Sequence, residues 1–224
     1  MKISTTRLET FSDCVIAIIL TIMILQLRLP DLDKHDPTTH QIIYYLKNLL
    51  PNFVTYTFSF MMISIFWTNH HHMFHLLGNT DEVLLWQNFL FMFLVSLIPF
   101  ATAIVGANPF IPIAPAIYGT VMLLTSLCLT LMRSYSIRKK LLHTDRDKSV
   151  NLKISRISIR SRTKAIIGTL VYLISIPLAY VNVYFSYACF IIPPIIFFIP
   201  EGTENEKLAK KLVQKNIQND MQAE

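Results

Sequence analysis

The sequence predicts an all-α, polytopic membrane protein, and its composition and charge distribution carry this prediction. Hydrophobic residues make up 53% of the chain and charged residues only 15%, against about 25% charged residues in an ordinary soluble domain. Three long segments, 48–80, 83–132 and 165–200, contain no Asp, Glu, Lys or Arg. Because a soluble fold needs charged groups on its surface throughout stretches of this length, we expect these segments to lie in a membrane.

Six apolar segments are candidate transmembrane helices, which need about 20 residues to cross a hydrocarbon core about 30 Å thick. They are residues 7–29, 45–67, 84–105, 112–132, 165–183 and 185–200. We therefore expect six transmembrane helices per subunit, which form one membrane domain over residues 1–200. The sixth segment is the shortest and contains Pro193 and Pro194, and the polar segment 201–224 follows it as a cytoplasmic tail.

Helix-breaking residues separate these segments in chain order. Pro30 ends the first helix, because proline has no backbone N–H and cannot continue the hydrogen-bond ladder. Asn108, Pro109 and Pro112 interrupt the hydrophobic run between the third and fourth helices. Asn182 marks a tight turn between the fifth and sixth helices.

The distribution of loop charge predicts the orientation in the membrane. The segment 133–164 carries eleven Lys and Arg residues against Asp145 and Asp147, and loops rich in Lys and Arg stay in the cytoplasm. The first loop, 30–44, is net acidic and belongs outside. An even number of helices then places both termini in the cytoplasm. The net charge of +6 reflects orientation and contact with the lipid bilayer, so we expect no nucleic-acid partner.

The first helix carries three ionisable residues near its start, Arg7, Glu9 and Asp13, and such residues are rare and functional in transmembrane helices. Arg7 and Asp13 are about 240° apart around the helix, so each needs a partner on another helix. Candidate partners at the inner end of the second helix are Trp67, Asn69, His70, His71, His72 and His75. Two interpretations are open: Arg7, Asp13, Trp67 and His71 form a polar network, or Trp67 and the histidines form an interfacial belt.

His71 and His75 are four residues apart, a spacing that can hold a metal ion. The sequence places no carboxylate or cysteine beside them. We therefore expect no metal and no other cofactor, and a site of His71 and His75 is the weaker alternative. The histidine run 70–72 is the sole candidate for enzyme chemistry, and it lacks convergent partners, so no enzymatic activity is predicted.

The remaining polar and sulfur-containing residues of the apolar segments have structural interpretations. Cys14, Cys128 and Cys189 show no metal-binding or disulfide spacing, and we expect them to be small buried side chains. Asn88 and Thr102 are expected to form hydrogen bonds between helices, as small polar groups do in membranes.

The residues of the first helix also match a known signature. Arg7-x-x-x-Phe11-Ser12-Asp13 resembles the R-x-x-x-F-S-D signature of the transmembrane protein 175 family. Further matches follow in the same order: Phe66-Trp67-x-Asn69-His70-His71-x-x-Phe74, Asn88, Pro99-Phe100-x-Thr102 and Tyr118-Gly119. The resemblance runs from the first helix to the fourth, and the last two helices match in length and in the basic segment before them.

Members of this family are potassium-permeable channels of lysosomes and bacteria. The resemblance therefore implies a potassium-selective or potassium-preferring channel in the bacterial inner membrane, built as a homotetramer whose central pore is lined by the first helix. It also implies that no T-V-G-Y-G filter is present, and the sequence contains none. The constriction is expected at Ile18, with Ile22 and Leu25 above it and Thr21 beside it. The expected supporting network consists of Arg7, Phe11, Ser12, Asp13, Trp67, Asn69, His70 and His71.

The residues alone leave other interpretations open. Ile18, Ile22 and Leu25 share one helix face, but nearly all of that helix is apolar, so lipid contact or packing explains them as well. The alternative function is a secondary transporter of cations or protons. Such a protein would show inverted repeats and an acidic residue near the membrane midplane, whereas this sequence shows no repeat and Asp13 lies near the inner end of its helix.

Overall fold

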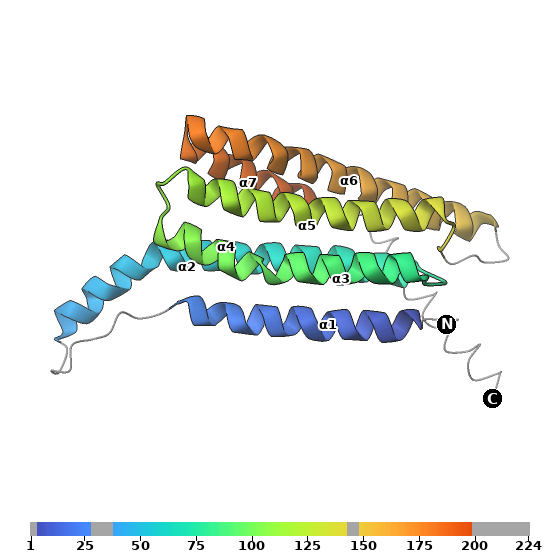
Figure 1. The fold of residues 1–224 in the computed structure, drawn as a ribbon, viewed down its shortest axis with the longest axis horizontal. Helices are drawn as coiled ribbons and strands as arrows, with labels where there is room; N and C mark the ends of the chain where they lie inside the picture. Colours follow the sequence, from blue (N-terminus) through green and yellow to red (C-terminus); the bar gives the residue numbers. More distant parts are fainter. Residues whose placement is uncertain (1–3, 28–37, 143–147, 199–224) are drawn as a thin grey trace.

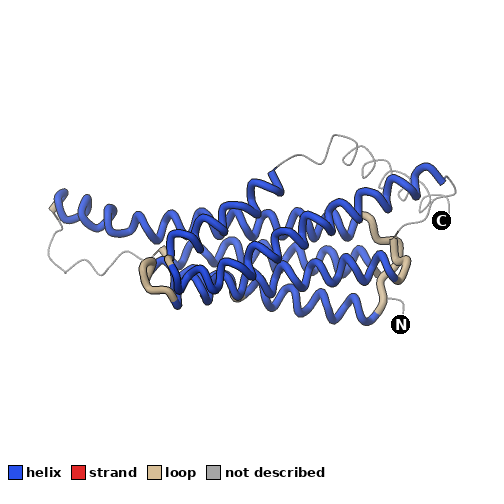
Figure 2. The backbone as a smooth tube through the Cα atoms, turned by 90° about the horizontal axis from the view of Figure 1, so that it is seen from above, coloured by secondary structure: helices blue, strands red, loops and turns tan. Residues whose placement is uncertain are grey.

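The computed structural model describes the backbone of residues 4–27, 38–142 and 148–198, and every regular element within these ranges is helical (Figure 2). The elements are α1 (Thr5–Ile22), the 3₁₀-helix η1 (Met23–Gln26), α2 (Thr39–His75), α3 (Glu82–Ser96), α4 (Ile98–Ala107), α5 (Ile113–Arg138), α6 (Lys148–Val181) and α7 (Val183–Phe198). Pro30, the acidic part of the first loop and the tail 201–224 lie outside the described residues.

The helices form an elongated bundle in which successive spans run in opposite directions, with α3 and α4 following one another in the same direction (Figure 1). α1 forms one edge of the bundle and packs against α2 and α3, while α5, α6 and α7 form the opposite side. The start of α1 lies at the same end as the α2–α3 turn, because Thr5 Oγ1 is 2.7 Å from Thr80 Oγ1. The α5–α6 turn joins this end as well, since Gly78 N donates to Leu141 O at 2.9 Å.

Five described helical segments are long and apolar enough to cross a membrane, and Val183–Phe197 is a shorter apolar helix. α3 and α4 together make one of these spans, since the helix is broken only at Leu97. Each of the six predicted segments thus corresponds to an apolar helical unit, which confirms the all-α fold class. The chain is a multi-pass membrane protein.

Two predicted boundaries differ from the structure around α2. The helix begins at Thr39 rather than at residue 45, and Thr38 N donates to Gln41 Oε1 at 2.9 Å to cap its start. It ends at His75 rather than at residue 67, so the histidine-rich segment is helical and does not follow the helix. Both differences have the same cause: the predicted bounds follow the hydrophobic segment, and the helix continues through the polar residues at each of its ends. Figure 1 shows the first turns of α2 projecting beyond the bundle, with Pro51 inside the helix.

The prediction that the basic segment 133–164 forms a loop is wrong. α5 continues to Arg138 and α6 begins at Lys148, so most of this segment is helical. Lys and Arg are good helix formers, and a transmembrane helix can extend beyond the hydrocarbon core with such residues. The described part of the turn contains Lys140 in the left-handed region, with φ of 56°, and residues 143–147 lie outside the description.

Hydroxyl groups and a glycine hold the middle of the bundle together. The buried Ser59 Oγ lies 3.0 Å from the Tyr118 hydroxyl and 2.8 Å from Thr102 Oγ1, so α2, α4 and α5 share one polar contact. This confirms the predicted interhelical hydrogen bond of Thr102. A Cβ on Gly119 would lie 2.9 Å from Ser175 Oγ, so a larger residue there would force the Ser175 side chain or the spacing of α5 and α6 to shift.

Candidate functional site

α1 has one buried and one exposed face in the isolated subunit. The buried positions recur at helical spacing and pack against α2 and α3: Leu8, Ser12, Ile16, Ile19 and, in η1, Met23. The expected pore residues lie on the other side. Ile18 is 55% exposed, Ile22 51% and Leu25 64%, and Thr21 is exposed as well. An open stripe of large apolar side chains at one edge of a bundle is a surface for lipid or for further protein copies.

The 3₁₀ turn η1 continues this exposed stripe. In a 3₁₀-helix, residues three positions apart lie on the same face, so Leu25 lies above Ile22. The Thr21 hydroxyl donates to Ile18 O at 2.8 Å. Cys14 is exposed on the same side of α1, which makes the expectation of a buried thiol wrong for this residue, whereas Cys128 is buried as expected.

The structure brings Asp13 and Trp67 together. Trp67 Nε1 donates to Asp13 Oδ1 at 2.8 Å, and the ring of His71 stacks on the Trp67 indole with centroids 5.2 Å apart. Asp13 therefore faces α2, directly before the apolar half of α1 that begins at Cys14. The indole N–H supplies the donor that a carboxylate near the membrane needs.

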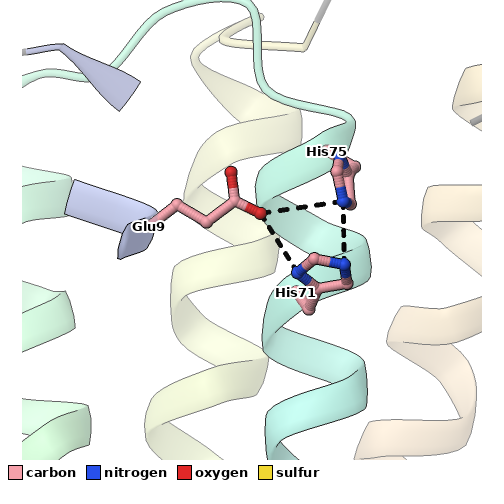
Figure 3. A group of neighbouring side chains, drawn as sticks. All are labelled: Glu9, His71 and His75. Carbon is pink, nitrogen blue, oxygen red and sulfur yellow. Dashed lines mark hydrogen bonds and ion pairs between the residues drawn. The ribbon is translucent and has the colours of Figure 1, made fainter. Parts of the chain in front are cut away.

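Glu9 lies one turn before Asp13, and it meets two histidines of α2 (Figure 3). Its Oε1 is 3.1 Å from His71 Nδ1 and 3.7 Å from His75 Nε2. Because α1 and α2 are antiparallel, one turn back along α1 corresponds to one turn forward along α2. The Asp13–Trp67 contact therefore places Glu9 beside His71, and the sequence-based expectation that no carboxylate lies near the histidines is wrong.

Arg7 does not join this cluster. Its side chain is exposed and, among the described residues, it forms no ion pair with Asp13 or Glu9. The neighbouring signature residue Phe11 is 48% exposed and makes an edge-to-face contact with Phe89 of α3, with ring centroids 5.9 Å apart. Within the signature, Phe11 thus contacts α3, while Asp13 contacts α2.

A second polar contact of α1 is fully buried. Asn88 Nδ2 donates to Ser12 Oγ at 2.8 Å, and Asn88 Oδ1 lies 2.7 Å from His70 Nε2. All three side chains are completely buried, and the His70 ring stacks between Phe74 and Phe91. The chain Ser12–Asn88–His70 confirms the predicted interhelical role of Asn88. It also excludes an interfacial-belt position for His70.

Asn69, the remaining residue of the expected network, forms its described hydrogen bonds with α2 and α5 rather than with α1. Its side-chain Nδ2 donates to Ile65 O of its own helix at 2.8 Å, and its backbone carbonyl accepts from Arg133 of α5 at 2.8 Å. Arg133 is only 4% exposed. The sequence predicts that Arg133 lies in the basic loop 133–164, because the first charged residue after an apolar segment usually indicates the end of a transmembrane helix. Its burial depends on how α2 and α5 pack, which no local pattern reports.

Comparison with known proteins places the chain among ion channels. Residues 7–99 match the family model of the endosomal/lysosomal potassium channel TMEM175. A potassium channel of Chryseobacterium sp. (strain P1-3) is 31% identical over 195 residues, which cover 87% of this chain and 93% of that protein. A potassium channel of Chamaesiphon minutus is 27% identical and covers 84% of this chain and 91% of that protein.

Two solved structures share the fold. The crystal structure of a lysosomal potassium-selective channel TMEM175 homolog from Chamaesiphon minutus has a TM-score of 0.72 at 24% identity and covers 87% of this chain and 96% of that chain. The potassium channel MtTMEM175 T38A variant has a TM-score of 0.58 at 15% identity, with 96% and 93% covered. Because the Chryseobacterium relative is similar along nearly its whole length and the signature of α1 lies inside the matched segment, the chain belongs to the TMEM175 family, a family of ion channels and not of enzymes.

Proposed function

We propose that this chain forms a potassium-preferring cation channel, a homotetramer with a central pore lined by α1. One observation carries the proposal: the stripe of Ile18, Ile22 and Leu25 is more than half exposed in the isolated subunit, on a helix whose other face is packed. The names of the relatives support the choice of ion, since the Chryseobacterium and Chamaesiphon proteins are potassium channels.

In this proposal Ile18 is the gate. Four copies of a branched apolar side chain around an axis exclude water when they are close together, and a cation that loses its water in apolar surroundings costs several kcal/mol or more. Ions pass when the four helices separate or rotate. The polar contacts of Ser12 and Asp13 support this arrangement, because they hold the opposite face of α1 against α3 and α2.

The orientation belongs to the same proposal. The start of α1 shares one end of the bundle with the α2–α3 and α5–α6 turns, and the α5–α6 turn carries Arg138, Lys139 and Lys140. By the positive-inside rule this end is cytoplasmic. We therefore assign both termini to the cytoplasm of a bacterial inner membrane. Monovalent cations are the expected permeating species, and no cofactor is required.

Reconstitution of the purified full chain in planar bilayers tests the function. Under bi-ionic K⁺/Na⁺ conditions we expect a reversal potential whose sign shows a higher permeability to K⁺ than to Na⁺. We also expect the current to show no saturation of the kind that a coupled transporter shows. Ile18→Asn should raise conductance and weaken the ion preference, because a polar ring stays hydrated. Ile174→Asn is the matched control, since Ile174 of α6 is also 53% exposed but lies away from α1. An unchanged Ile18→Asn channel would exclude the pore assignment.

A further inference from the structure

Glu9, His71 and His75 form a compact cluster of potential metal ligands at the point where α1 crosses the end of α2. One ligand atom from each residue lies within 4.8 Å of the other two. Figure 3 shows the three side chains pointing toward one another, Glu9 from α1 and the histidines from successive turns of α2. The two helices are thus connected by a carboxylate and two imidazoles, the ligand types that Zn²⁺ and similar ions bind.

The distances within the cluster suit tetrahedral coordination. A zinc ion binds imidazole nitrogen and carboxylate oxygen at about 2.0–2.2 Å, so two of its ligands lie about 3.4 Å apart. Glu9 Oε1 lies 3.1 Å from His71 Nδ1 and 3.7 Å from His75 Nε2, on either side of that value. The other nitrogen of His71, Nε2, shares a hydrogen bond of 2.8 Å with His75 Nε2. An ion bound to His71 Nδ1 and His75 Nε2 would replace this hydrogen bond at His75.

Two of the ligand atoms are buried without a hydrogen bond. Glu9 Oε1 and His71 Nδ1 form an ion pair at 3.1 Å, but their geometry is not that of a hydrogen bond, and within the described residues neither atom has another hydrogen-bond partner. A buried acceptor without a donor is unfavourable, because it has lost its contact with water and gained no partner in exchange. A cation between the two atoms would satisfy both lone pairs at once. This observation is independent of the spacing of the ligands.

The surroundings are those of an ordered but accessible site. The indole of Trp67 stacks on His71, and Asp13 holds that indole through its Nε1. Such contacts around the ligands orient them for metal binding. The side chains of His71 and His75 are 32% and 28% exposed, so an ion can enter from the aqueous side and keep a water molecule as its fourth ligand.

We propose that Glu9, His71 and His75 bind a divalent transition-metal ion, with Zn²⁺ as the reference ion, and that this ion cross-links α1 to α2. Soft thiolate ligands are absent from the cluster, so imidazole and carboxylate favour Zn²⁺, Ni²⁺ or Co²⁺ over Ca²⁺ or Mg²⁺. Binding is independent of whether the protein conducts ions. If α1 lines the pore, the bound ion restrains the helix that must move during gating.

Metal titration of the purified full chain tests the site directly. After removal of metals with a chelator, Co²⁺ should bind with about one ion per chain and give the visible absorption of a tetrahedral complex, which Zn²⁺ should abolish by competition. Glu9→Gln and His75→Gln should each weaken binding by at least about tenfold. His72→Gln is the matched control, because His72 is the adjacent histidine and does not belong to the ligand set. Its affinity should equal that of the wild type.

Footprinting of the wild type tests the site without any variant. Diethyl pyrocarbonate modifies accessible imidazoles, and mass spectrometry locates the modified residues. Zn²⁺ should protect His71 and His75 and leave His40 and His72 unprotected. Absence of binding to the wild type, equal affinity in Glu9→Gln and His75→Gln, or protection of all four histidines alike would each overturn the proposal and leave a Glu9–His71 ion pair as the role of the cluster.

Discussion

The two halves of the first transmembrane span are held by different kinds of contact. In the first half, up to Asp13, four polar side chains reach neighbouring segments: Thr5 contacts Thr80, Glu9 contacts His71 and His75, Ser12 contacts Asn88, and Asp13 contacts Trp67. In the second half, from Cys14 to Gln26, the described hydrogen bond of Thr21 stays within the helix, and apolar packing does the rest.

This difference separates anchoring from motion. Hydrogen bonds and ion pairs fix one register, because their strength falls steeply with distance and angle. Apolar contacts are non-directional, so a helix held only by them can rotate or slide at a small cost. The start of α1 is therefore the fixed end and its apolar half is the part that can move. Each prediction below tests one side of this contrast.

The largest effect on assembly of the channel is expected at the fixed end. Asp13→Ala leaves the Trp67 indole N–H without its acceptor and should cost about 1–3 kcal/mol, enough to lower strongly the yield of assembled channel in size-exclusion chromatography. Asp13→Asn keeps an acceptor oxygen and should recover part of the yield. Thr10→Ala serves as a control, because the Thr10 hydroxyl bonds only within α1. A normal yield from Asp13→Ala would show that this contact does not anchor the helix.

A large effect on current is expected from modification of Cys14 in the second half. Cys14 is exposed on the same side of α1 as the proposed pore stripe. A charged methanethiosulfonate reagent should therefore reduce most of the current through the wild-type channel, and Cys14→Ser should abolish this sensitivity. Cys128 is buried and provides an internal control. Insensitive wild-type currents would place this face of α1 away from the pore.

A moderate effect on stability is expected from Asn88→Ala. The substitution removes the group that joins Ser12 to His70, both completely buried. Interhelical hydrogen bonds in membranes contribute about 0.6 kcal/mol on average and up to about 1.7 kcal/mol. The upper end applies here because two partners lose their contact, and thermal unfolding in detergent measures the loss. Equal stability of the variant would remove Ser12–Asn88–His70 from the set of anchors.

The smallest effect on stability is expected at the tip of the span. Leu25→Ala should change the free energy of unfolding by less than about 0.5 kcal/mol, as for other exposed positions, while it alters single-channel conductance. Met23 of the same 3₁₀ turn is fully buried, so Met23→Ala should cost about 2–5 kcal/mol. If Leu25→Ala cost more stability than Met23→Ala, the assignment of Leu25 to the exposed stripe and of Met23 to the packed face would be wrong.

Much of the fold could be predicted from the sequence, because the cost of burying charge determines which segments span the membrane. The requirement for a donor to Asp13 also follows from its sequence position, and Trp67 meets it. The helix ends were missed around α2 and α5, since hydrophobic runs end before helices do. The partner predicted for Arg7 is not found among the described residues, because an exposed guanidinium does not need one.

The metal-ligand cluster could not be predicted without the relative placement of two helices. Glu9 and His71 are far apart in the sequence, and either residue alone is an ordinary polar side chain. Once Asp13 is paired with Trp67, antiparallel packing places Glu9 beside His71 and His75. The relative placement of α1 and α2 therefore determines the cluster. If the predicted Asp13–Trp67 contact is taken as given, one further turn along both helices leads to Glu9 and His71.

The 3₁₀ turn at the end of the first span has a mechanical consequence. Its four residues rise about 2.0 Å each instead of about 1.5 Å, and they turn by about 120° each instead of about 100°. Winding this turn into the α form would therefore retract the tip of the span by about 2 Å and swing it through about 80°. A change in the winding of η1 would thus move its side chains along the helix axis and rotate them around that axis at the same time.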